Sequence, residues 1–99
     1  MADKHAYLVA GKRSPIGKYL GTLAKLNAVE IGGQVGKALL AEARADLAAF
    51  NEVFVGQVLQ AGCGQNPARQ VALAAGLPDT ISCCTVNKVC GSGLQAVMF

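Results

Sequence analysis

Cys90 is the residue of this 99-residue chain whose type and position could support covalent chemistry. It follows the β-prone run 81–86 and a short polar turn, and Gly91 and Gly93 come directly after it. We expect the sulfur to lie at or near the first turn of a helix, where free N–H groups and the helix dipole favour a thiolate. The small glycines leave room for a substrate. Cys90 is therefore a candidate nucleophile, although a structural cysteine beside a glycine-rich turn fits the same spacing.

Other glycine-containing stretches lack the spacing of known phosphate or nucleophile motifs. Five residues separate Gly11 from Gly17, one more than a phosphate-binding loop has, and Tyr19 stands where that loop has serine or threonine. Residues 91–93 supply only part of a dinucleotide fingerprint. Their central serine has glycine on both immediate sides, unlike the serine of a G-x-S-x-G elbow. We reject all three motifs.

The remaining cysteines show no spacing typical of metal ligands, because there is no C-x-x-C pair and His5 is the chain's one histidine. The chain starts without a signal-peptide core or a transit pattern, which predicts a cytoplasmic protein with reduced thiols. Adjacent cysteines in a strand would face opposite sides, which suits disulfides poorly. We expect no metal and no cofactor, and we expect three cysteines to be small buried hydrophobes: Cys63, Cys83 and Cys84.

The composition excludes several classes of protein. Hydrophobic residues make up 53% and charged residues 15%, which excludes a disordered or low-complexity chain. No apolar run approaches the roughly 18 residues of a membrane span. The net charge of +3 forms no basic stripe with interleaved aromatics, which argues against nucleic acid and leaves acidic small molecules open as ligands. A chain this apolar should hide more surface than a free small domain does, so we expect a fragment or a subunit.

The elements that must position Cys90 alternate between strand and helix. Short apolar or β-branched runs predict strands over 6–10, 52–59 and 81–86. The first helix is predicted to begin at the capping pair Asn27 and Glu30, with an apolar stripe that reaches Leu47. A second helix is predicted from Pro67 to Ala75, and a third after Cys90. The order β-α-β-α-β-α indicates an α/β fold, a mostly parallel sheet with helices packed on it.

Three glycines in the first predicted helix, at 32, 33 and 36, each cost about 1 kcal/mol of helix propensity. We expect a neighbouring element to approach the backbone closely there. The third helix stops at Phe99 without a glycine, a basic last turn or a cap. The chain therefore looks cut within that helix.

The segment Val86–Val97 resembles the nucleophile segment of thiolases. Arg13–Gly17 and Gly56–Gln70 are similar to two further thiolase segments in the same order. The stretches Gly56–Gln70 and Val86–Val97 look most like the acetyl-CoA acetyltransferases, the biosynthetic branch. The resemblance implies a partial thiolase-like fold, with residues 1–99 forming the first part of the family's N-terminal domain, truncated in the nucleophile helix.

The resemblance also implies a two-step acyl transfer with Cys90 as nucleophile. The thiolate would attack acetyl-CoA and release CoA, and a second acetyl-CoA, deprotonated at its methyl carbon, would take the acetyl group to form acetoacetyl-CoA. The reverse reaction is thiolysis. The Cys90 backbone N–H is a candidate oxyanion donor. CoA thioesters are then substrates rather than cofactors, and the full-length protein is expected to be a homo-oligomer, a dimer or a tetramer.

In thiolases the activating histidine, the second cysteine and most of the CoA-binding loop come from later sequence, so the fragment alone is expected to be inactive. His5 matches no thiolase motif and should lie near the surface. Lys88 is left out of the site, because strand alternation should point it elsewhere. Residues 65–66 and 69–70 are expected to pack or to lie near a subunit contact rather than do chemistry.

Three alternatives stay open. In the first, the chain is part of a 3-ketoacyl-CoA thiolase of broader chain length. In the second, it is a non-catalytic truncated product that only associates with full-length subunits. A redox or metal-binding cysteine module would instead predict retained zinc or a disulfide.

Overall fold

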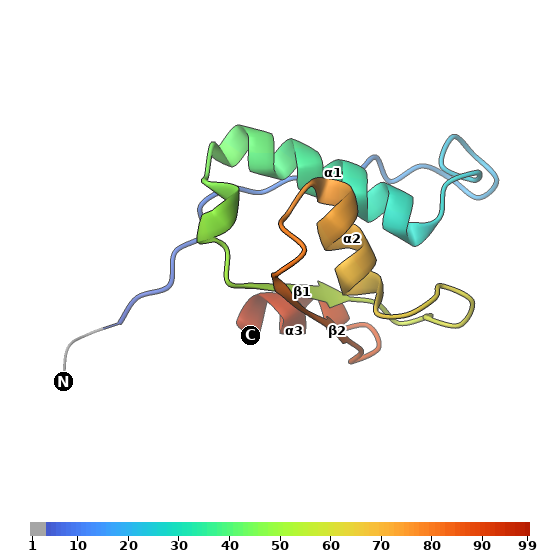
Figure 1. Cartoon of the computed structure of the whole chain (residues 1–99). Helices are drawn as coiled ribbons and strands as arrows, with labels where there is room; N and C mark the ends of the chain where they lie inside the picture. Colours follow the sequence, from blue (N-terminus) through green and yellow to red (C-terminus); the bar gives the residue numbers. More distant parts are fainter. Residues whose placement is uncertain (1–3) are drawn as a thin grey trace.

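The computed structural model describes residues 4–99. In chain order it contains α1 (Ala28–Ala43), a short 3₁₀ helix η1 (Leu47–Ala49), β1 (Glu52–Gly56), α2 (Pro67–Ala75), β2 (Ser82–Val86) and α3 (Ser92–Met98). The helices α1 and α2 lie on one side of the strands and α3 lies on the other (Figure 1). The predicted α/β class is confirmed.

The two strands are parallel, and α2 is the crossover between them. Their register runs from Glu52 opposite Ser82 to Gly56 opposite Val86. Strand β1 is shorter than predicted, because its partner ends at Val86 and offers no ladder beyond that point. The carboxyl ends of both strands therefore meet at one edge of the sheet, where the chain turns into α3.

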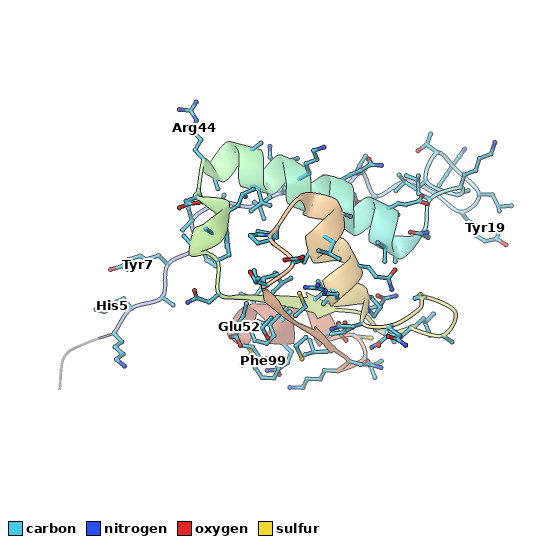
Figure 2. The ribbon with its side chains drawn as sticks, viewed as in Figure 1. His5, Tyr7, Tyr19, Arg44, Glu52 and Phe99 are labelled. Carbon is cyan, nitrogen blue, oxygen red and sulfur yellow. The ribbon has the colours of Figure 1, made fainter. Side chains whose placement is uncertain are left out.

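The strand predicted over 6–10 does not form. This segment is extended but pairs with neither β1 nor β2. Tyr7, Leu8 and Val9 are 79%, 89% and 80% exposed, and Figure 2 shows Tyr7 and His5 on a segment that runs away from the body of the chain. A local apolar run cannot supply the partner whose hydrogen bonds define a strand, so the sequence pattern was insufficient here.

The predicted capping box at the start of α1 is confirmed. The Glu30 N–H donates to Asn27 Oδ1 at 2.8 Å, and the Asn27 N–H donates to Glu30 Oε2 at 3.4 Å. The helix ends earlier than its apolar stripe predicted. Arg44 turns into the left-handed region at a φ of 52°, and Leu47 belongs to η1 instead.

The glycines of α1 face α2, as the sequence predicted. A Cβ atom added at Gly33 would lie 2.6 Å from the Cβ of Ala74, and one added at Gly36 would lie 3.0 Å from the Cβ of Ala75. Gly32 approaches Val71 in the same way. Because these three positions of α1 carry no side chain, the two helices can pack closely.

The core is small and consists mainly of α2. Its buried apolar side chains are Ala68, Ala72, Ala75 and Ile81, and no large side chain among residues 4–99 is fully buried. The accessible surface is 7591 Å², whereas a folded monomer of this size exposes roughly 5,300 Å². The chain thus exposes apolar surface that a small monomeric domain ordinarily buries, in line with its composition.

Candidate active site

Cys90 lies in the connection between β2 and α3. The next residue, Gly91, is the N-cap of α3, so the cysteine sits immediately outside the helix start. Its side chain is exposed and its thiol is free. The candidate nucleophile is therefore at the carboxyl edge of the parallel strands and open to solvent.

The turn before Cys90 is held by side chains. Asn87 Oδ1 accepts a hydrogen bond from the Val89 N–H at 2.9 Å. Ser92 Oγ donates to the Val89 carbonyl at 2.7 Å and accepts from the Lys88 N–H at 2.8 Å. These hydrogen bonds close residues 87–92 into one loop, and Cys90 is part of that loop.

The loop that follows β1 reaches the same place. Asn87 Nδ2 donates to the Val58 carbonyl at 3.2 Å, which joins the connections that leave β1 and β2. A Cβ added at Gly56 would overlap the Ser92 carbonyl and lie 2.6 Å from the Gly93 nitrogen. The end of β1 is thus in backbone contact with the first turn of α3.

The backbone donors near Cys90 are only partly used. The Gly91 N–H donates to the Lys88 carbonyl at 2.9 Å, and the Ser92 N–H donates to the Val89 carbonyl at 3.1 Å. Within residues 4–99 the Cys90 N–H donates no hydrogen bond. It is free to bind an acceptor from outside the chain.

No described side chain between residues 4 and 99 forms a hydrogen bond with Cys90 Sγ. Lys88 Nζ donates to Gln95 Oε1 at 3.2 Å, so this cation is directed at α3. His5 is exposed on the N-terminal extended segment (Figure 2), as predicted. A group that removes the Cys90 proton is missing from this part of the chain.

The other three cysteines are less buried than the sequence suggested. Cys63 and Cys83 are half-buried and Cys84 is exposed. Side chains alternate along β2, so Cys83 and Cys84 face opposite sides of the sheet. Thr85 marks the side of α2, because its Oγ1 accepts from the Ala68 N–H at 2.9 Å. Cys84 lies on the other face, where α3 packs mainly on β1 and covers β2 less.

Asn66, Arg69 and Gln70 have structural contacts. Asn66 donates to the Cys83 carbonyl at 3.1 Å and accepts from Thr85 Oγ1 at 2.7 Å, which fixes the start of α2 to β2. Arg69 donates to the Asp79 carbonyl at 2.6 Å.

Gln70 donates to the carbonyls of Cys63 and Gln65, at 2.7 and 2.9 Å, and so closes the loop before α2. The predicted packing role of this region is met within the chain itself.

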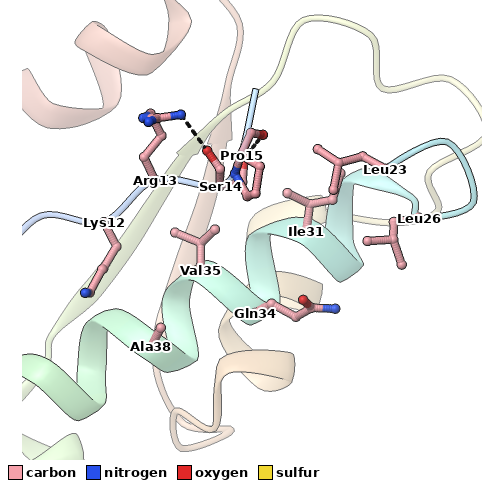
Figure 3. A pocket seen from close by; sticks show the side chains of 10 residues that line it. All are labelled: Lys12, Arg13, Ser14, Pro15, Leu23, Leu26, Ile31, Gln34, Val35 and Ala38. Carbon is pink, nitrogen blue, oxygen red and sulfur yellow. Dashed lines mark hydrogen bonds between the residues drawn. The ribbon is translucent and has the colours of Figure 1, made fainter. Parts of the chain in front are cut away.

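A separate pocket of about 190 Å³ lies between the segment 12–15 and α1 (Figure 3). Lys12 pairs with Glu42 at 3.3 Å, and the Arg13 guanidinium donates to the Ser14 carbonyl at 2.9 Å. No cysteine lines this pocket. Both cations of this pocket are thus paired within the chain, and no helix follows Gly17 directly, so the rejected phosphate loop finds no support.

In the described part of the chain, none of the helices has both the length and the apolar character needed to cross a membrane.

The sequence matches known proteins over nearly all of its length. A family model described as the thiolase N-terminal domain covers residues 6–99. The chain is 53% identical over 91 residues to the acetyl-CoA acetyltransferase of Cupriavidus necator, covering 92% of this chain and 23% of that protein. It is 48% identical over 92 residues to the cytosolic acetyl-CoA acetyltransferase of Gibberella zeae, covering 93% and 23%.

A solved structure agrees with these matches. The Acat5 thiolase of Ascaris suum, crystallised with coenzyme A, superposes with a TM-score of 0.89 at 39% identity, over 93% of this chain and 24% of that one. The chain thus spans about a quarter of the length of the proteins it matches. With its partial α/β fold and its match to the thiolase N-terminal domain, this chain belongs to the thiolase family.

Proposed function

We propose that this chain carries the nucleophile of an acetyl-CoA C-acetyltransferase, and that residues 1–99 form part of its N-terminal domain. The observation that carries the proposal is the placement of Cys90. Its thiol is exposed and unbonded at the start of α3, and its own N–H is free. The similarity to proteins named acetyl-CoA acetyltransferase, and to a thiolase crystallised with coenzyme A, supports acetyl-CoA as the substrate.

The reaction proceeds in two acyl transfers. Cys90 Sγ, as the thiolate, attacks the thioester carbon of acetyl-CoA, and the bond to the CoA sulfur breaks to release CoA thiolate. The Cys90 N–H hydrogen-bonds the oxyanion of the tetrahedral intermediate. A second acetyl-CoA then loses a methyl proton to a base, and its carbanion attacks the acetyl carbon. Acetoacetyl-CoA leaves, and Cys90 returns as the thiolate.

Two protons must be removed, one from the Cys90 thiol and one from the methyl group of the second acetyl-CoA. Both steps need groups that residues 4–99 do not place at Cys90. We therefore expect the 99-residue chain alone to release no CoA from acetyl-CoA in repeated turnovers. The large exposed apolar surface supports further protein packed on this domain, either the rest of the chain or other subunits of a homo-oligomer. The name of the Gibberella zeae relative supports a cytoplasmic location.

The proposal is tested by joining residues 6–99 to the remaining sequence of the Cupriavidus necator relative, in place of its matching segment. We expect this joined protein to condense acetyl-CoA and to cleave acetoacetyl-CoA, measured by CoA release and CoA consumption. Cys90→Ala should lower the rate by at least about a thousandfold, since removal of a nucleophile removes the covalent path.

Cys84→Ala is the matched control, because Cys84 is also exposed and lies in β2 rather than before the start of α3. It should retain activity. Full activity of the Cys90→Ala protein would contradict the proposal. A joined protein that folds and associates without activity would favour a non-catalytic associating product, and a preference for longer 3-ketoacyl-CoA substrates would favour a thiolase of broader chain length.

A further inference from the structure

Val89, the residue before Cys90, has an unfavourable backbone conformation. Its φ is +46°, in the left-handed region that β-branched residues rarely adopt. Its side chain is 62% exposed, so packing of the side chain does not force this conformation. Contacts of the Val89 backbone must therefore stabilise this left-handed conformation.

The hydrogen bonds of Val89 identify the cause. Its N–H donates to Asn87 Oδ1 at 2.9 Å, and its carbonyl accepts from Ser92 Oγ at 2.7 Å. The same carbonyl also accepts from the Ser92 N–H at 3.1 Å. Side chains from both sides of the turn therefore bind the two polar backbone groups of the strained residue.

Both side chains are themselves anchored. Ser92 is only 4% exposed, and its hydroxyl also accepts the Lys88 N–H at 2.8 Å. Asn87 uses its amide nitrogen to bind the Val58 carbonyl at 3.2 Å, beyond the end of β1. The left-handed turn is thus held between the start of α3 and the connection that leaves β1.

We propose that Asn87 and Ser92 are positioning residues that keep Val89 left-handed and thereby fix the place of Cys90 for acyl transfer. The inference rests on the proposed function of Cys90. Without these bonds Val89 relaxes toward a negative φ, which redirects the following peptide and moves Cys90 away from the helix start. Misplacement of a reacting group by about 1 Å costs up to about a hundredfold in rate.

The test compares two exposed thiols of the joined protein that carries residues 6–99, because the groups that residues 4–99 lack at Cys90 are then supplied. The joined protein is incubated with acetyl-CoA, and the initial rates of acetylation of Cys90 and Cys84 are measured by peptide mass mapping. We expect Cys90 to react faster in the otherwise unmodified joined protein. Asn87→Ala and Ser92→Ala should each lower the ratio of the two rates by about tenfold or more.

A second substitution separates positioning from general damage. Glycine adopts the left-handed region without steric cost, so Val89→Gly added to Asn87→Ala should restore the ratio to within about threefold of the original. Val89→Ala added to Asn87→Ala should not restore it. Asn87→Asp, which keeps the acceptor for the Val89 N–H, should also retain the ratio.

Amide hydrogen exchange reports the turn independently of the chemistry. Exchange of the Val89 N–H should accelerate at least about tenfold in Asn87→Ala, and that of the Lys88 N–H should do the same in Ser92→Ala. Asn51→Ala and Ser82→Ala are matched controls, since neither side chain forms a hydrogen bond within residues 4–99 and both lie outside this turn. Neither should change the exchange or the ratio.

The outcomes distinguish the two proposals. If Cys90 in the otherwise unmodified joined protein reacts no faster than Cys84, the proposed chemistry of Cys90 is wrong and the positioning role falls with it. If Cys90 is preferred but Asn87→Ala and Ser92→Ala keep that preference, only the positioning role is wrong. Failure of Val89→Gly to rescue Asn87→Ala would also overturn it.

Discussion

The helices on the two sides of the sheet are attached in different ways. On one side, α1 packs on α2 through small residues, with Gly33 against Ala74 and Gly36 against Ala75. On the other side, α3 meets the strands through the backbone contact at Gly56 and the side-chain hydrogen bonds of residues 87–92.

The contact between α1 and α2 depends on matching shapes and tolerates no added volume. The attachment of α3 instead fixes the backbone conformation of residues 87–92 and leaves the Cys90 thiol exposed, which is what a reacting group needs.

The starts of α1 and α2 show a related contrast. Both have asparagine at the N-cap, but only Asn27 caps its helix with its side chain. Asn66 is left-handed, with a φ of 43°, and directs its side chain to Cys83 and Thr85 of β2. The same residue type stabilises a helix end in one place and joins a helix to a strand in the other.

The largest effect on stability is expected for Gly56→Ala. The new Cβ would overlap the backbone of Ser92 in α3, which cannot move without displacing the helix. We expect a loss of about 3 kcal/mol in the free energy of unfolding, measured by urea denaturation. Gly93→Ala is the control: its Cβ meets nothing within 4 Å, and it should gain up to about 1 kcal/mol from helix propensity. Equal stabilities of the two variants would show that α3 does not contact β1 as described.

Gly33→Ala should have a smaller effect on the α1–α2 contact. Overpacking against Ala74 costs about 2 kcal/mol, and the better helix propensity of alanine returns about 1 kcal/mol, so a net loss of about 1 kcal/mol remains. Thermal unfolding measures it. Gly11→Ala, with open space around its Cβ, should change the stability by less than about 0.5 kcal/mol. Stabilisation by Gly33→Ala would mean that the helices do not approach closely.

Asn27→Ala sharpens the comparison of the two asparagines. We expect a loss of about 1 kcal/mol through the lost cap, with reduced helix content in far-ultraviolet circular dichroism. Asn27→Asp keeps the acceptor for the Glu30 N–H and should lose little. In contrast, Asn66→Ala should weaken hydrogen-exchange protection in β2 rather than helix content, and the opposite pattern would remove the distinction between the two caps.

The smallest effect is expected for the ion pair between Lys12 and Glu42. Both side chains are substantially exposed, 41% and 53%, so Lys12→Met should cost no more than about 0.5 kcal/mol. The loss should shrink further at about 1 M salt, since surface charges are then screened. A salt-independent loss above that size would indicate a contact other than the ion pair.

Much of the fold could be predicted because its signals are local. These signals act through neighbouring backbone groups. They are the capping pair Asn27 and Glu30, Pro67 at the start of α2, and Gly76 at its end, where φ is +98°. The strand over 6–10 could not be judged that way, since pairing depends on a partner distant in sequence. The prediction that Cys84 is buried was wrong for the same reason, because its burial depends on where the distant helix α3 packs.

The site was predictable in part. The residue pattern around Cys90 placed it at a helix start, where the structure has it. Asn87 and Ser92 were missed, although an asparagine two residues before Val89 is a known signal for a side-chain-to-backbone turn. The burial of Ser92 between two glycines had no local signal, because it depends on the close packing of Gly56, at the end of β1, against the first turn of α3.

The most direct test of the central claim is to trap the acyl-enzyme. The joined protein with residues 6–99 is mixed with acetyl-CoA, quenched in acid and mapped by peptide mass. We predict one acetyl group per chain, on Cys90, and none on Cys63, Cys83 or Cys84. An acetylated cysteine other than Cys90, or turnover without any acetylated cysteine, would contradict the account.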